Sequence, residues 1–405
     1  MRTAQPIDPF GHDIQGEADR LRAAGPCVPV VLPGGIEAWS ITRQPLLKRL
    51  LTDPRVSKDP YLHWPAFRAG EIPETWPLYT WVAVRNMFTA YGMEHRRLRR
   101  LVAPAFTARR TEAMEPLVRD IVGDLLRKLA ITDPAHPVDL RETYTHPLPI
   151  QVICALFGVP DSMRTDLRRA VDGVFNTAAG AEEVMATQKM LYGLLTELIA
   201  GKRAAPGDDM TSDLIATRDD EEQGLTEQEL IDTLLLILSA GHETTVNLIG
   251  NAVHALLTHP DQLALVRAGE ATWDDVIEET LRWAPSVASL PLRYAVEDIA
   301  VEGGPVISAG DAIVAGYAAA GRDPERYGPT AGLFDITRGD KEHLAFGHGV
   351  HRCLGAPMAR MEARIALPAL FDAFPGLRLA SPADDLPPIE SFIAHGFRSI
   401  PVLLG

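Results

Sequence analysis

The segment FGHGVHRCLG, residues 346–355, contains the residues of this chain that are best suited to chemistry. Cys353 follows a glycine-rich turn and comes directly before a helical pattern that starts LGAPMARMEARIALP. At a helix N-terminus, unpaired backbone N–H groups and the helix dipole favour a thiolate, so the pKa of Cys353 is expected to fall. Gly355 permits the close approach of a flat group, and Phe346 can shield the sulfur from water.

Three interpretations of this cysteine remain open from its neighbours alone. A lone cysteine is most often a buried structural residue. His343, His348 and His351, together with Cys353, offer the donor types of a zinc site. A thiolate bound to haem iron is the third interpretation. The helix N-terminus weakens the first interpretation but does not separate zinc from haem.

Composition and charge restrict the class of protein. The formal net charge of −15 argues against general binding to nucleic acid. Three cysteines, an odd number spread along the chain, indicate no disulfide framework. The N-terminal residues show no signal-peptide pattern, and the apolar run LLLILSAG is too short to span a bilayer. We therefore expect a cytoplasmic protein with no nucleic acid and no membrane partner.

The elements that must position the cysteine loop are mainly helical. Apolar residues recur every three or four positions in three segments: 111–130, 184–203 and 273–284. The longest pattern begins at Thr226, which forms a capping box with Glu229, and it stops at Pro260. At 1.5 Å per residue this helix would span roughly 50 Å, and it is apolar on most faces, which is typical of a buried central helix.

Strand patterns are short and few, at 28–33, 37–42, 311–317 and 399–404. Residues 1–20 are expected to be an irregular N-terminal segment, and the polar residues 204–222 a surface connection. The sequence therefore predicts one mainly α domain of residues 1–405 with small β-sheets.

Four segments, in order, resemble the cytochrome P-450 superfamily. In the cysteine loop, Phe346, Gly349, Cys353 and Gly355 have the spacing of its haem signature. The resemblance implies the P-450 fold, with haem b held between the long distal helix and the helix after the loop. It also implies that Cys353 is the axial ligand of the iron. The chain is most similar to soluble bacterial members of actinobacterial type.

The second matching segment is AGHETT, which begins at Ala240 in the middle of the long helix. From the residues alone, Thr244 would simply bond to a carbonyl one turn earlier. The resemblance implies that the helix opens at Gly241 above the haem. It further implies that Thr244 and Glu243 deliver protons while oxygen is activated.

The third segment holds Glu279 and Arg282 at helical spacing. Its ordinary interpretation is a surface ion pair worth a few tenths of a kcal/mol. The resemblance implies instead a buried pair that braces the cysteine loop. Leu333 occupies the position where many members have a further arginine, and Arg326 or Arg338 is expected to replace it.

The fourth segment, 93–110, resembles the helix that binds the haem propionates. Across the chain, four residues match propionate partners: His95, Arg99, Arg293 and His351. The other expected cofactor contacts are Phe346, Gly347, Ala240 and Gly241. A solvated basic helix face is the alternative interpretation, and it suits Arg96 and Arg100 better than His95.

The resemblance implies a haem-thiolate monooxygenase that uses O2 and two electrons from a ferredoxin, supplied by a ferredoxin reductase. Six arginines in 93–110, with Arg352 beside the cysteine, predict a basic docking patch for that acidic partner. Two other classes stay open. One is a haem sensor or carrier without turnover, and the other is a hydrolase that uses zinc or the cysteine.

Aromatic residues are concentrated in 61–91, and the resemblance makes this region the roof of the substrate pocket. The predicted pocket residues are Trp81, Val84, Ala240, Val287, Leu290, Leu292, Phe392 and Ile393. None of them is charged. We therefore expect a bulky, mostly apolar small molecule of steroid or macrolactone (polyketide) type.

Overall fold

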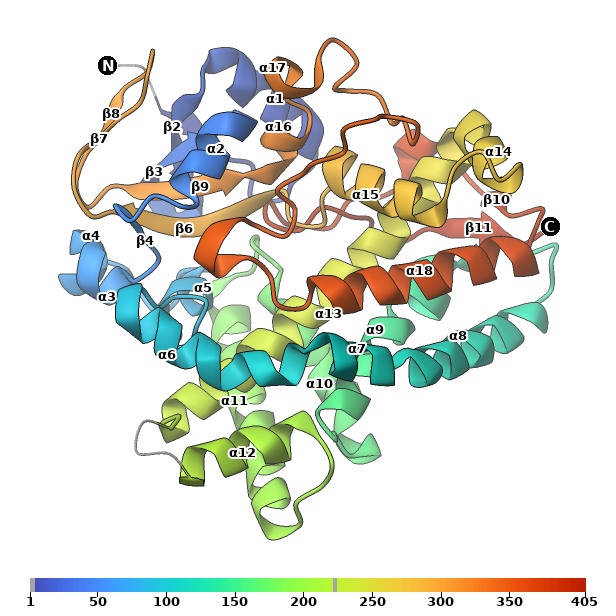
Figure 1. The fold of residues 1–405 in the computed structure, drawn as a ribbon, viewed down its shortest axis with the longest axis horizontal. Helices are drawn as coiled ribbons and strands as arrows, with labels where there is room; N and C mark the ends of the chain where they lie inside the picture. The colour runs from blue at the N-terminus through green and yellow to red at the C-terminus, as the bar shows by residue number, and fades with distance from the viewer. Residues whose placement is uncertain (1–3, 221–223) are drawn as a thin grey trace.

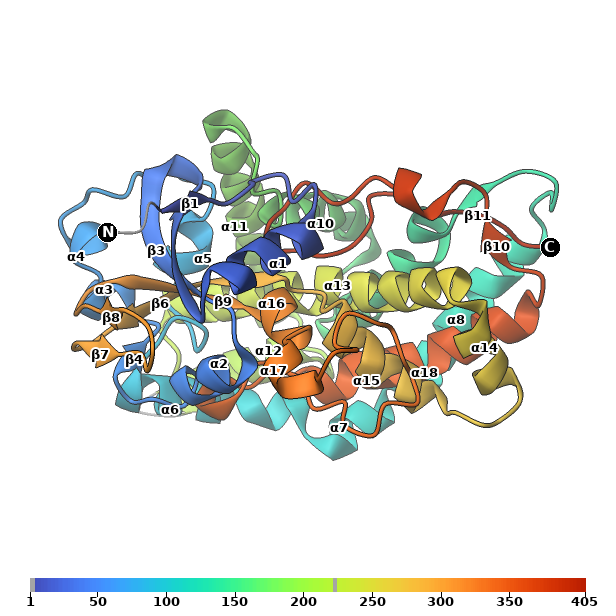
Figure 2. The ribbon, with the colours of Figure 1, turned by 90° about the horizontal axis from the view of Figure 1, so that it is seen from above.

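A single long helix, α13, runs through the middle of the molecule and organises the fold (Figures 1 and 2). The computed structural model describes residues 4–220 and 224–405. In it α13 spans Glu227–Thr258, and Thr226 and Glu229 form the predicted capping box. Pro260 begins the next helix. The predicted limits of the central helix are therefore confirmed, and its middle is buried as its apolar pattern requires.

Helices α9, α15 and α18 pack against α13, and α8 packs against α9 and α18. Their apolar faces form one continuous core along the second half of α13. The helices span α1 Ile14–Ala24, α2 Gln44–Leu50, α3 Pro60–His63, α4 Pro65–Arg68, α5 Tyr79–Ala83, α6 Gly92–Val102, α7 Ala108–Ala113, α8 Glu115–Ala130, α9 Pro147–Leu156, α10 Asp161–Val174, α11 Ala181–Ala204, α12 Met210–Asp220, α13 Glu227–Thr258, α14 Pro260–Arg267, α15 Trp273–Trp283, α16 Tyr317–Gly321, α17 Pro324–Tyr327 and α18 Ala356–Ala373.

The strands form a six-stranded sheet at one end of the molecule (Figure 1) and two smaller sheets. In sheet order the large sheet contains β1 Gln5–Pro6, β2 Cys27–Leu32, β3 Ile36–Ile41, β9 Ala312–Gly316, β6 Ser289–Ala295 and β4 Val56–Ser57. The others pair β10 Arg378–Leu379, β11 Pro401–Leu403 and β5 Val138–Asp139, and β7 Ile299–Ala300 with β8 Val306–Ile307. The four predicted strands correspond to β2, β3, β9 and β11.

The register of β6 matters for the site. Leu290 and Arg293 are three residues apart on β6, but their partners on β9, Ala315 and Ile313, are two residues apart. β6 therefore contains one extra residue between Leu290 and Arg293. In a regular strand, residues three apart point to opposite faces. The extra residue brings Leu290 and Arg293 to the same face, and both line the pocket described below.

Two predictions about segments are wrong. The segment 1–20 was expected to be irregular, but its described part contains regular structure. β1 pairs with β2 in parallel, and α1 begins at Ile14 with Asp13 as its N-cap. Residues 204–222 are not a plain connection, because α12 buries Met210, Leu214 and Ile215 against the helical core. Residues 1–3, 221 and 222 of these segments lie outside the described residues. Within the described part of the chain, no helix is long and apolar enough to cross a bilayer.

Candidate active site

The cysteine loop is held by its own backbone. The N–H of Cys353 donates to the carbonyl of Phe346 at 2.9 Å, and the N–H of Gly347 donates to Leu344 at 2.8 Å. Gly347 and Gly349 have φ values of 69° and 71°, which favour glycine. A side chain on Gly349 would also meet the carbonyl oxygen of Leu51 at 2.8 Å. The glycine-rich turn therefore fixes where the sulfur points.

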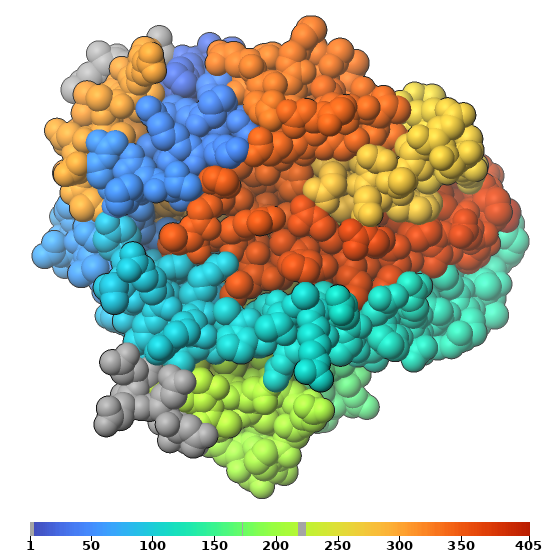
Figure 3. Space-filling view, in the orientation of Figure 1, coloured from blue at the N-terminus to red at the C-terminus, as the bar shows by residue number. Residues whose placement is uncertain are grey.

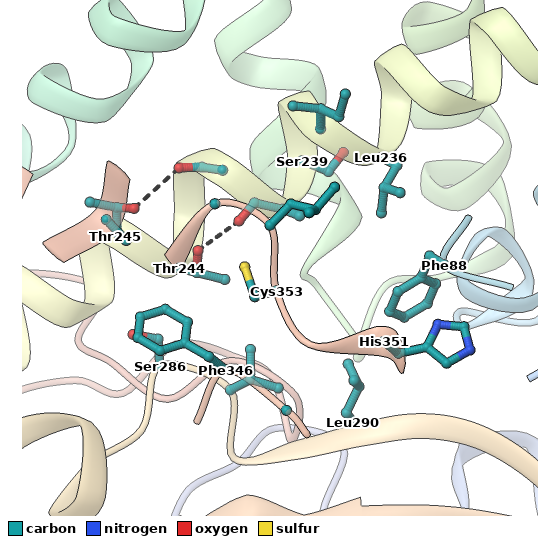
Figure 4. A pocket seen from close by; sticks show the side chains of 18 of the residues that line it. Phe88, Leu236, Ser239, Thr244, Thr245, Ser286, Leu290, Phe346, His351 and Cys353 are labelled. Carbon is teal, nitrogen blue, oxygen red and sulfur yellow. Dashed lines mark hydrogen bonds between the residues drawn. The ribbon is translucent and has the colours of Figure 1, made fainter. Parts of the chain in front are cut away.

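The sulfur of Cys353 faces a pocket between its loop and α13 (Figure 4). Desolvation raises the pKa of this thiol, although the N–H groups of Gly355 and Ala356 and the charges of Arg99 and Arg360 act to lower it. The side chain is exposed to the pocket. The expected fall in the pKa of Cys353 is thus wrong for the protein alone: although the side chain faces the pocket, desolvation by the protein around it outweighs the N–H groups of the helix N-terminus.

Helix α13 forms the other side of the pocket, and its lining residues include Ala240, Gly241, Thr244 and Thr245. The hydroxyl of Thr244 donates to the carbonyl of Ala240 at 2.6 Å, and that of Thr245 donates to Gly241 at 3.3 Å (Figure 4). A hydrogen bond to the carbonyl one turn earlier is the ordinary interpretation of Thr244 from the residues alone. This bond also leaves the lone pairs of Thr244 available to accept a further hydrogen bond. Gly241 has a packing reason as well, since a Cβ there would meet Ile153 at 2.9 Å.

Glu243 does not line the pocket. Its carboxylate is 3% exposed and lies 3.0 Å from the Nη2 of Arg141 through both oxygens. Arg141 also donates to the side-chain oxygen of Asn247 at 3.2 Å. The structure therefore brings Thr244, but not Glu243, to the pocket wall.

Basic side chains gather in one part of the lining: Lys58, Arg99, Arg293 and His351. Arg99 also donates to the carbonyl of Arg352 at 2.7 Å, which ties α6 to the cysteine loop. His95 lies just behind, with its ring centroid 4.1 Å from that of His351. Three of the four predicted propionate partners, Arg99, Arg293 and His351, thus line the pocket. The fourth, His95, lies outside the lining and packs against His351.

Sequence reasoning missed Lys58. Its ammonium lies 3.5 Å from the centroid of the Phe88 ring, and the residue is 3% exposed. Desolvation lowers the pKa of Lys58, and the nearby charge of Arg293 lowers it further. Lysine is almost always exposed, and nothing in the run VSKDP marks this one as buried.

The pair predicted to brace the loop is fully buried. Glu279 and Arg282 are both 0% exposed, with an Oε1–Nη2 distance of 2.7 Å. Arg282 also donates to three backbone carbonyls, those of Gly321, Ala331 and Leu333. Arg338 completes the group with its Nε 3.5 Å from Glu279, whereas Arg326 pairs with Asp340 and Glu342. Of the two expected replacements, Arg338 is the one that lies beside Glu279.

Most of the predicted pocket residues are in place: Trp81, Val84, Ala240, Val287 and Leu290. Leu292, Phe392 and Ile393 do not line the pocket, since they are at most 2% exposed in a core cluster beside the sheet. Leu292 points away because strand alternation sets it opposite to Arg293. Phe88 lines the pocket from the aromatic segment 61–91 that was predicted to roof it. Apolar lining residues that the sequence did not mark include Met87, Phe106, Val174, Phe175 and Leu236.

The zinc interpretation is not supported by the geometry. Within residues 4–220 and 224–405, no three His, Cys, Asp or Glu side chains are grouped so that they could hold a metal ion. His343 is engaged elsewhere, with its Nε2 3.1 Å from Glu278. The carboxylate of Glu278 also binds Arg360. Desolvation acts to raise the pKa of Glu278, but the hydrogen bonds and charges of Arg360 and His343 stabilise the carboxylate and lower its pKa to about 2.

One exposed surface lies directly over the cysteine loop. α6 and the loop lie side by side on the face drawn in Figure 3. Their exposed residues include Arg96, Arg100, Arg352 and the apolar Val350. Arg97 and Arg110 are occupied by Glu229 and Asp213 respectively. We call Arg96, Arg100, Arg352 and Val350 the proximal patch.

A cysteine opposite a threonine-bearing helix, in an apolar pocket with a cationic end, defines the class of haem-thiolate oxygenases. The family model described as Cytochrome P450 matches residues 272–395. A curated relative, 2-hydroxy-5-methyl-1-naphthoate 7-hydroxylase of Streptomyces carzinostaticus, is 42% identical over 98% of this chain and 97% of its own. The chain belongs to the cytochrome P450 family, and it is a monooxygenase with haem as its cofactor.

Solved structures agree. CYP154A1 from Streptomyces coelicolor A3(2) has a TM-score of 0.95 and 57% identity over 99% of this chain and 100% of that chain. Testosterone-bound CYP154C4 from Streptomyces sp. ATCC 11861 has a TM-score of 0.96 and 44% identity over 100% and 99% of the two chains. The predicted family and the mainly α P-450 fold are therefore confirmed. Because the chain is a monooxygenase of this family, the two alternatives, a haem sensor or carrier and a hydrolase, are excluded.

The residues of the pocket fit haem. In the described part of the chain, the Nζ of Lys58, the Nε2 of His95 and an Nη of Arg293 are buried without a hydrogen-bond partner. Buried donors without acceptors are costly, and an anionic group beside them removes that cost. Burial, with the charges of Arg99 and Arg96, also lowers the pKa of His95 to about 4. These donors would suit the two propionates of haem, and the Cys353 sulfur on the pocket wall would suit its iron.

Proposed function

We propose that this monooxygenase hydroxylates a bulky, mostly apolar small molecule of steroid or macrolactone type. The observation that carries this proposal is the wall above the cysteine: every lining residue from α5, α10 and α13 is uncharged. Burial of apolar surface is the main driving force for ligands in such a pocket. The relative that was solved with testosterone supports a steroid-sized ligand.

In this proposal the Cys353 thiolate would ligate the haem iron, and Lys58, Arg293, Arg99 and His351 would hold the propionates. When bound, the haem supplies the hard chemistry: with O2, two electrons and two protons, one oxygen atom enters a C–H bond and the other leaves as water. The chain's own residues orient the substrate, exclude water and move protons. Thr244 accepts a hydrogen bond from a proton donor in the pocket, and Glu243 supplies protons toward it when its carboxylate separates from Arg141.

The experiment that tests the proposal is a reduced carbon monoxide difference spectrum, followed by titration of the ferric protein with testosterone and with a macrolactone. We expect a red-shifted Soret band and a low- to high-spin change with at least one of them. A colourless protein would contradict haem ligation. A spin change seen only with small or charged compounds would contradict the substrate class.

Replacing Thr244→Ala is expected to lower the product formed per electron consumed by roughly 10- to 100-fold, because a lost proton-transfer group typically costs at least this much. Peroxide release should rise in step, while substrate affinity from the spin change stays within about twofold. Thr244→Ser keeps the hydroxyl and is the control. Equal coupling in the wild type and Thr244→Ala would remove Thr244 from proton delivery.

We further propose that a ferredoxin docks on the proximal patch and passes electrons to the haem over the short path through the cysteine loop. Arg96→Glu and Arg352→Glu are each expected to lower kcat/KM for ferredoxin about tenfold at low salt, with a smaller effect at high salt. Arg20→Glu on α1 is the exposed control. Unchanged ferredoxin kinetics at low salt in both patch variants would exclude this surface.

A further inference from the structure

A second pocket lies beside the first and differs from it in chemistry. It is enclosed by α11, the start of α13 and the segment around α5, and it shares the lining residues Thr80 and Val84 with the main pocket. Its wall is polar: Tyr61, Tyr79, Arg85, Gln188, Tyr192, Gln228 and Asp232. We call it the polar pocket. None of these seven residues lines the apolar pocket above Cys353.

Asp232 is the fixed point of the polar pocket. It is 1% exposed, and its carboxylate accepts from the hydroxyl of Tyr192 at 2.7 Å, from Gln228 at 2.9 Å and from the N–H of Arg85 at 2.7 Å. These three donors come from α11, α13 and the segment after α5. The polar groups are therefore held in place before any ligand binds, which reduces the entropy cost of binding.

A thin partition separates the two pockets. Gln188 donates to the hydroxyl of Thr80 at 2.8 Å, and Thr80 lines both pockets. Beside it, Tyr61 donates to the carbonyl of Ala83 at 2.7 Å, and the Arg85 guanidinium lies 3.9 Å from the Tyr61 ring centroid. Because Thr80 and Val84 line both pockets, the two pockets adjoin at these residues.

Asp232 and Arg85 give the polar pocket opposite charges, so an ion of either sign meets one attractive and one repulsive group and gains little from charge. The remaining groups are amides and phenol hydroxyls, which both donate and accept hydrogen bonds, and aromatic rings, which pack against C–H surfaces. An uncharged ring that carries several hydroxyl groups satisfies all of these features together.

We infer that the polar pocket binds a neutral, hydroxyl-rich ring, such as a sugar residue, attached to the apolar body of the substrate. The inference rests on the proposed function, because the apolar body must lie in the pocket above Cys353. It makes the substrate a glycoside or similar amphiphile, in which the apolar part reaches the haem and the hydroxylated part sets its orientation.

The first test isolates the polar pocket from the substrate question. Methyl β-D-glucoside is added to the haem-loaded protein, and its binding is followed by saturation-transfer NMR. We expect a signal in the wild type that falls at least threefold in Gln188→Leu and in Gln228→Leu. Gln151→Leu on α9 is the matched control, since Gln151 bonds only within its own helix turn to Pro147 and lines neither pocket.

The second test compares testosterone with its 17-O-β-glucoside by the spin-state change. The glucoside should bind at least tenfold tighter in the wild type, and Gln188→Leu and Gln228→Leu should abolish that preference while the testosterone Kd stays within twofold. The inference would be overturned if the wild type binds the testosterone glucoside but the glutamine variants give the same methyl glucoside signal as the wild type. A methyl glucoside signal that depends on both glutamines, without a response to either steroid, would uphold the polar pocket and refute the steroid proposal instead.

Discussion

Cys353→Ser is expected to abolish the red-shifted Soret band of the reduced carbon monoxide complex and to lower hydroxylation by at least about 10³-fold, because the thiolate's electron donation to the iron drives the oxygen chemistry. The protein should still fold, since the loop is held by backbone hydrogen bonds to Phe346 and Leu344 and not by the sulfur. Haem content, the difference spectrum and thermal unfolding together measure this.

Cys154→Ala is the control for that variant. Cys154 is 1% exposed on α9, and desolvation raises the pKa of its thiol to about 11. Its replacement should lower stability by about 1 kcal/mol through the small cavity it leaves, without any change in the spectrum. A thiolate-type spectrum in Cys353→Ser, or its loss in Cys154→Ala, would show that the ligand is misassigned.

The second large effect concerns the buried ion pair of Glu279 and Arg282. Arg282→Met leaves Glu279 buried without its main partner and frees three backbone carbonyls, so we expect the free energy of unfolding to fall by about 3–5 kcal/mol. That is a large part of the 5–15 kcal/mol typical of a folded protein. Urea unfolding and haem retention are the measurements, and most of the variant should lack haem at 37 °C.

Arg127→Met provides a matched comparison on the surface. Arg127 and Asp124 have the same acid–arginine spacing of three residues on α8, with side chains 74% and 59% exposed. Exposed pairs contribute at most about 1 kcal/mol, so this variant should unfold almost like the wild type. Equal stability loss in the two variants would mean that burial does not determine the strength of the Glu279–Arg282 pair.

The sequence predicted the elements whose signals are local. The capping box at Thr226, the apolar period of the long helix and the spacing around Cys353 depend on residues close together in the chain, and all are present in the structure. The resemblance added the buried state of Arg282, which the spacing alone would have assigned to the surface.

What the sequence did not predict depends on contacts between distant segments. Lys58 is buried only because Phe88 and the sheet close around it, and α12 forms because its apolar residues find the helical core. Glu243 is drawn away from the pocket by Arg141, a hundred residues earlier in the chain. The prediction of a lowered pKa for Cys353 is wrong for a similar reason, since desolvation by distant segments of the fold outweighs the local helix N-terminus.

The extra residue in β6 has a consequence for how this enzyme can change. It lets one strand line the pocket with both the apolar Leu290 and the basic Arg293, the residues proposed to meet the substrate and the haem. A side-chain replacement at Leu290 alters the fit of the substrate alone. An insertion or deletion between the two residues turns one of them out of the pocket, so it cannot modify selectivity without also loosening the haem. At this strand we therefore expect new substrate ranges to arise by point substitution and not by a change in length.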